Sequence, residues 1–145
     1  MSAAQPTARA AAVGLGAIAG LHCVWATGST WPLSSPEALN DRVAGRTSGE
    51  PPSSAACLAV AALLTAAAGF VDGHPRSRPG LARLGAAGVV STLTLRGGLG
   101  MAGRTDLLSP GSASAAFRSR DRRVYSPVCL TLAALALPAA LPGRG

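Results

Sequence analysis

The sequence is short of charge, of aromatic side chains and of paired cysteines, and it has no lysine at all. Only 13% of its 145 residues are charged, about half of the roughly 25% found in soluble chains. Two Trp, two Phe and one Tyr are too few for a base-stacking platform, so we expect no nucleic-acid partner. The three cysteines form no Cys-x-x-Cys motif, so neither a zinc ribbon nor a thioredoxin-like redox pair is indicated.

Long apolar stretches are present instead. Hydrophobic residues make up 48% of the chain, and about twenty in a row are needed to cross the roughly 30 Å hydrocarbon layer of a membrane. Four segments have this length, at about residues 10–28, 53–71, 84–103 and 124–142, and the loops 29–52, 72–83 and 104–123 carry most of the arginines. We therefore predict an all-α fold, an integral membrane four-helix bundle with antiparallel spans that forms one domain over residues 1–145. We expect a multi-pass protein of the cell membrane.

The first apolar segment has an alternative interpretation as a signal peptide. Arg9 would be its basic region and Val24-Trp25-Ala26 its cleavage site. His22 and Trp25 are unusual in the apolar part of a signal peptide, and three further apolar segments follow. Both observations favour a membrane span.

Local signals predict where two helices begin. Ser126 is expected to cap the fourth span, with Pro127 at its first helical position, where the missing N–H costs nothing. Residues 36–43 are expected to form a short surface helix within the first loop.

The third apolar segment contains an arginine. Leu84 to Leu95 is only twelve residues, about 18 Å of helix, which is too short to cross a membrane. Arg96 is therefore expected within the membrane layer, where a charged residue is by default a functional-site candidate. The alternative is a structural role, in which Arg96 reaches the headgroups past the small residues that follow it.

Unusual residues gather at the membrane face opposite the termini. Antiparallel spans bring the ends of spans 1 and 3 to the same face as the starts of spans 2 and 4. Arg122 and Arg123 would lie at the headgroups, and Tyr125 at the boundary that amphipathic rings prefer. The candidate polar cluster at this face consists of His22, Trp31, Arg96, Asp121, Arg122, Arg123 and Tyr125.

Metal, redox and transport chemistry find weaker support. His22 and Cys23 are neighbours on a helix and point about 100° apart, so both cannot easily bind one ion, and we predict no metal site and no cofactor. Cys129 has two interpretations, as a thiol activated by the helix start and nearby arginines or as a small hydrophobic residue. No Asp or Glu lies inside any expected span, which argues against a proton-coupled exporter.

Two hypotheses for function follow. In the first, a non-enzymatic membrane protein uses the polar cluster to bind an anionic lipid headgroup or a partner protein, because the guanidinium fork of Arg suits phosphate. In the alternative, a membrane enzyme or redox protein acts on a lipid or quinone, with His22 as acid or base and Arg96 holding the anionic group. No catalytic residue is assigned.

The arginines divide almost evenly between the two membrane faces. Five arginines fall on the side of the termini and seven on the other, which is indecisive for the positive-inside rule. Arg9 next to the first span favours cytoplasmic termini, whereas the arginines of loop 104–123 argue the reverse.

Three ordered motifs give the chain a family resemblance. They are His22-x-x-Trp25-Ala26-x-Gly28-x-x-Trp31-Pro32, Leu95-Arg96-Gly97-Gly98 and Asp121-Arg122-Arg123-x-Tyr125-Ser126-Pro127-x-Cys129-Leu130. With these motifs the chain resembles an uncharacterised family of small four-helix integral membrane proteins, frequent in actinobacteria and known as a domain of unknown function. The resemblance covers about residues 10–142. It implies a membrane location and supplies no activity.

Overall fold

The computed structural model describes residues 4–45, 52–108 and 114–142, and these form helices and turns without strands. The prediction of an all-α fold is confirmed. Four long helices account for most of the chain: α1 (Ala4–Ala26), α3 (Ser54–Val71), α4 (Pro79–Met101) and α7 (Ser126–Ala140). The short elements are α2 (Pro36–Leu39), α5 (Thr105–Leu108), α6 (Ala115–Arg120) and two π-helical turns, η1 (Asn40–Ala44) and η2 (Asp121–Tyr125).

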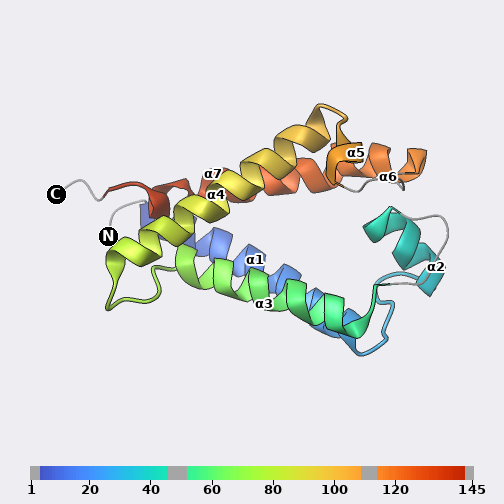
Figure 1. Ribbon diagram of the computed structural model, residues 1–145, viewed down its shortest axis with the longest axis horizontal. Coiled ribbons are helices and arrows are strands. Elements are labelled where there is room, and N and C mark those ends of the chain that lie inside the picture. The colour runs from blue at the N-terminus through green and yellow to red at the C-terminus, as the bar shows by residue number, and fades with distance from the viewer. Residues whose placement is uncertain (1–3, 46–51, 109–113, 143–145) are drawn as a thin grey trace.

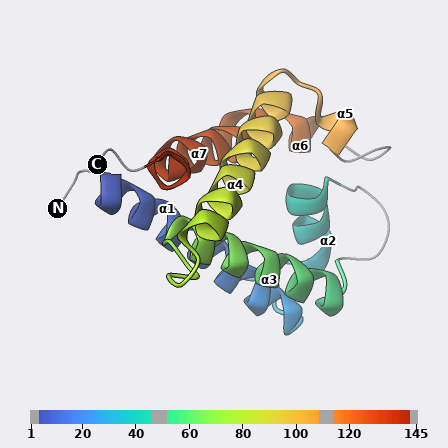
Figure 2. The ribbon, with the colours of Figure 1, turned by 60° about the vertical axis from the view of Figure 1, so that its left-hand side comes forward.

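The long helices are arranged as two pairs. Helix α1 lies beside α3, and α4 lies beside α7, as both ribbon views show (Figures 1 and 2). The pairs meet near the termini and diverge toward the other end, where α2 lies between them (Figure 1). Each pair is therefore a helical hairpin, and the long helices of the two hairpins approach each other most closely at the terminal end (Figure 1).

The core at that end is built from small and aliphatic residues. Ala11 and Leu15 of α1, Val71 of α3 and Leu132 and Ala136 of α7 are all buried in one cluster. Small side chains let helices approach closely, which is how helices pack where no water is present to drive their association.

Glycine brings α4 equally close to α7. A Cβ at Gly97 would lie 2.7 Å from Leu130 Cγ and 2.9 Å from the carbonyl oxygen of Ser126. Any larger residue at position 97 would force the two helices apart, so Gly97 serves helix packing.

Three helices are long and apolar enough to cross a membrane: Gln5–Ala26, Ser54–Val71 and the continuous helix Ala115–Ala140. They match three of the four expected spans, although α1 begins at Ala4 rather than near residue 10. Helix α4 has 23 residues but is not among the three, since Arg83, Arg96 and its glycines reduce its hydropathy.

The expected helix cap at Ser126 is wrong. Ser126 is helical and follows η2, and the helix begins instead at Ala115, where Ser114 accepts a hydrogen bond from the N–H of Phe117. Within this long helix the N–H of Ser126 donates to the carbonyl of Asp121, five residues back. Such a wide π turn makes room for Pro127, whose ring would otherwise clash with the carbonyl four residues before it.

The expected loops also contain helices. Helix α2 and turn η1 confirm the short helix predicted over residues 36–43. Segment 104–123, expected to be a loop, contains α5, α6 and the start of η2. The apolar pattern does not reveal α6 because its Arg118 and Arg120 resemble loop residues.

Candidate functional site

A buried ion pair joins α4 to η2. Nη2 of Arg96 donates to Oδ1 of Asp121 at 2.6 Å, and the side chain of Asp121 is 0% exposed while that of Arg96 is 28% exposed. Thr105 of α5, itself 1% exposed, donates its hydroxyl to Oδ2 of Asp121 at 3.2 Å. Both carboxylate oxygens of Asp121 therefore have donors.

This pairing explains how the chain tolerates an arginine in an apolar helix. An isolated buried charge is costly, whereas a paired and hydrogen-bonded one is largely compensated. The structure gives the charge of Arg96 a partner inside the protein, Asp121. That Arg96 belongs to a functional site stays a prediction.

The pair fits because position 100 has no side chain. A Cβ at Gly100 would overlap Oγ of Ser126 and would lie 2.7 Å from Oδ2 of Asp121 and 3.0 Å from Nη1 of Arg96. Oγ of Ser126 and Nη1 of Arg96 are both buried and have no hydrogen-bond partner in the structure. Gly100 thus allows three polar groups to converge between α4 and the π turn.

The first loop covers the start of the long helix 115–140. The hydroxyl of Tyr125 donates to the carbonyl of Arg42 at 2.6 Å, and the hydroxyl of Ser114 bonds to Oδ1 of Asp41 at 2.9 Å. Gly45, with a φ of 71°, lies against the buried ring of Phe117. These contacts fasten η1 to α6 and η2 across more than seventy residues of sequence.

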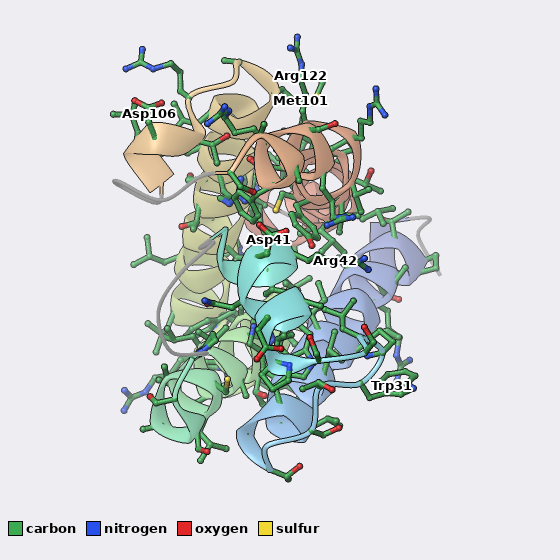
Figure 3. All side chains as sticks on the ribbon, turned by 90° about the vertical axis from the view of Figure 1, so that its right-hand side faces the viewer. Trp31, Asp41, Arg42, Met101, Asp106 and Arg122 are labelled. Atoms are coloured by element: carbon green, nitrogen blue, oxygen red, sulfur yellow. The ribbon has the colours of Figure 1, made fainter. Side chains whose placement is uncertain are left out.

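His22 and Trp31 lie in a different part of the molecule. Nδ1 of His22 bonds to the carbonyl of Ile18 at 2.9 Å, and its ring meets the ring of Trp25 edge-on at 4.9 Å. Nε1 of Trp25 donates to the carbonyl of Trp31, a residue that is 65% exposed. Figure 3 shows Trp31 and Arg122 at opposite sides of the molecule, with Asp41 and Arg42 between them.

The candidate polar cluster is therefore divided between the two hairpins. The structure brings together Arg96, Asp121 and the segment that contains Tyr125, and it places His22 and Trp31 on the other hairpin. That these seven residues form one functional site stays a prediction. The sequence predicts a single polar face because the antiparallel order of the spans brings these residues to the same end. That order does not reveal how far apart the two hairpins lie there.

Two arginines of the cluster remain free for other partners. Arg122 and Arg123 are exposed, and among the residues that the structure describes neither forms an ion pair. Arg122 points outward from the start of the long helix (Figure 3). Asp121, the nearest acid in sequence, is already paired with Arg96.

Cysteines and histidines form no cluster. Cys23, Cys57 and Cys129 are free thiols, exposed, buried and half-buried respectively. No group of three or more His, Cys, Asp or Glu side chains suited to a metal ion occurs within residues 4–45, 52–108 and 114–142. The reactive thiol considered for Cys129 stays a hypothesis.

Sequence reasoning missed two contributors to the site, namely Thr105 and Ser126 as a buried residue. Thr105 lies sixteen residues before Asp121 and carries no motif that indicates its role. The Gly97-Gly98-x-Gly100 spacing was visible and indicates a close approach, but the partner in that approach depends on the register of α4 against α7.

Comparison with known proteins identifies the family. Searches of curated proteins and of solved structures gave no match. A family model described as "Protein of unknown function (DUF3995)" matches residues 15–136, which include all four long helices in whole or in large part. The chain therefore belongs to the DUF3995 family, whose function is unknown.

Proposed function

We propose that the chain is a four-helix integral membrane protein with antiparallel spans that is not an enzyme and binds anionic lipid headgroups through Arg122 and Arg123. Three helices already have the length and hydropathy of membrane spans. We add α4 as the fourth span. We assign the binding of lipid headgroups to Arg122 and Arg123, which lie in the first half of the long helix 115–140.

The ion pair supports a membrane position for α4. Its 23 residues make about 35 Å of helix, enough to cross a bilayer. Helix α4 packs along α7, a segment apolar enough to span, so both share one environment. Because Asp121 neutralises Arg96, the α4–α7 hairpin carries no uncompensated charge at that position.

The headgroup proposal rests on Arg122 and Arg123, two adjacent exposed arginines at the turn η2 that form no ion pair with any residue the structure describes. Arginine binds phosphate through two parallel hydrogen bonds. A basic residue next to an anionic leaflet contributes about 1 kcal/mol of binding. The turn η2 precedes α7 directly, which is the expected headgroup level if α7 crosses the membrane.

Lipid analysis of membrane particles tests this proposal. The chain would be extracted from cells with its surrounding lipid in polymer-bounded particles, and the anionic and zwitterionic lipids counted by mass spectrometry. The variant Arg122→Gln/Arg123→Gln should lower the anionic enrichment severalfold, since it removes about 2 kcal/mol of attraction. The matched control Arg9→Gln/Arg83→Gln removes two exposed charges elsewhere and should retain the enrichment.

An unchanged lipid composition in Arg122→Gln/Arg123→Gln would contradict the proposal. If that variant instead loses a co-purified protein while its lipid stays the same, the arginines bind a partner protein. Both results would leave the membrane placement of the helices intact, because neither depends on it.

A further inference from the structure

An apolar groove runs between α3 and α4. Its volume is about 510 Å³, and among its lining residues only Thr92 is polar. The two helices meet at the turn that joins them and then diverge (Figures 1 and 2), which opens the groove along their length. Leu63, Leu64 and Phe70 line it from α3, Gly85 and Gly88 from α4, and Leu15 of α1 also contributes.

We infer that this groove binds one acyl chain of an anionic phospholipid, with the phosphate held by Arg78. The inference rests on the membrane placement proposed above, which puts the groove in the hydrocarbon layer. An apolar groove that opens to that layer is filled by hydrocarbon. Gly88, where an added Cβ would meet nothing within 4 Å, leaves room for an acyl chain along α4.

The lining of the groove suits an acyl chain. The groove extends along α4 from Gly85 to Leu93, about 12 Å of helix. Apart from Thr92, its lining residues have no polar side chain. A methylene chain needs no hydrogen-bond partner there.

The charge at one end of the groove favours an anionic lipid. Arg78 directly precedes Pro79, the first residue of α4, so it lies at the end of α4 that is joined to α3 by the turn. Arg78 is exposed and belongs to none of the ion pairs among the described residues. A phospholipid whose acyl chain lies in the groove would thus place its phosphate near the guanidinium of Arg78. A guanidinium binds phosphate through bidentate hydrogen bonds.

Native mass spectrometry of the full chain provides the test. The purified protein would be placed in detergent with dioleoyl phosphatidylglycerol or dioleoyl phosphatidylcholine, and the lipids retained per chain counted. Wild type should retain one phosphatidylglycerol molecule. Gly88→Leu should reduce that occupancy roughly tenfold, equivalent to about 1.4 kcal/mol, because leucine fills the groove, and Arg78→Gln should remove the preference for phosphatidylglycerol.

The chain offers a close control. Gly88 and Gly16 both have nothing within 4 Å of an added Cβ, and both are exposed helical positions, but only Gly88 lines the groove. Gly16→Leu should therefore retain the lipid. Thr92→Phe fills the groove from the next turn and should reproduce the effect of Gly88→Leu if that variant folds poorly.

Three results would overturn the inference. Full occupancy in both Gly88→Leu and Thr92→Phe would mean that the lipid binds elsewhere. Displacement of the lipid by excess glycerol 3-phosphate would mean that the phosphate alone is bound. Loss of a dimer, rather than of a lipid, would make the groove a contact between two copies. Arg122→Gln/Arg123→Gln should leave the retained lipid in place, so this inference and the headgroup proposal fail separately.

Discussion

Replacing Asp121 with Asn tests the buried ion pair between α4 and η2. The substitution keeps the shape of the side chain and removes the charge that neutralises Arg96, whose side chain is 28% exposed. Removing one partner of a buried pair costs about 3–5 kcal/mol because the other charge is left uncompensated. We expect a loss of about 3 kcal/mol in the free energy of unfolding, the lower end of that range, since Arg96 keeps some exposure.

Unfolding in SDS gives the measurement. The reaction of Cys57 with a maleimide would report on unfolding, because Cys57 is 4% exposed in the folded chain. The exposed Cys23 and the half-buried Cys129 would first be replaced by Ser. The double variant Arg96→Met/Asp121→Leu removes both charges together. It should lie within about 1 kcal/mol of wild type or above it, because replacing a whole buried pair with apolar residues is often neutral or stabilising.

The comparison of these two variants separates the contribution of charge from that of packing. A loss below about 1 kcal/mol in Asp121→Asn, the size of a surface ion pair, would show that the pair contributes little. A double variant as unstable as the single one would show that packing at position 121, and not charge, is what the substitution disturbs.

Three further predictions concern the surroundings of the pair. Gly100→Ala should cost about 1–3 kcal/mol by overpacking, whereas Gly98→Ala, where a Cβ meets nothing within 4 Å, should be neutral or stabilising in the same SDS assay. Thr105→Val should cost about 1–3 kcal/mol because Oδ2 of the buried Asp121 loses its donor, while Thr105→Ser should retain most of the stability. Tyr125→Phe should cost about 1 kcal/mol and speed amide hydrogen exchange in residues 36–45, since the bond to the carbonyl of Arg42 is lost; unchanged exchange there would refute that contact.

Much of the helical framework could be predicted from the sequence. Apolar length is a local property, so the three runs that become α1, α3 and α7 were evident without knowledge of their neighbours. The short helix predicted over residues 36–43 is also present, as α2 and η1.

The start of the last helix could not be predicted by the same local reasoning. Ser126-Pro127 has the chemistry of a helix start, but residues 115–125 are already helical and the π turn accommodates the proline. The preference for Ser at a helix N-cap describes a helix that is preceded by non-helical residues. Here residues 115–125 are held in helical form by contacts with η1, such as that of Tyr125 with Arg42.

The candidate site was predicted only in part for a similar reason. Arg96 was identified as unusual because the sequence alone shows a charged residue within an apolar segment. Its pairing with Asp121 was not predicted, since it depends on the register of α4 against the long helix, which Gly97 and Gly100 set through contacts with Leu130 and Ser126. His22 was grouped with Arg96 because antiparallel spans share a face, whereas the hairpins diverge at that end (Figure 1).

The most direct test of the account is whether α4 crosses the membrane. Arg78→Cys and Arg104→Cys place single thiols just before and just after α4, in a chain whose native cysteines are replaced by Ala. A membrane-impermeant maleimide would be applied to intact cells. We predict that only position 104 is labelled, which would put the termini in the cytoplasm and Arg122 and Arg123 outside. Labelling of position 78 alone would reverse this orientation but keep α4 as a span, whereas labelling of both positions would contradict the account.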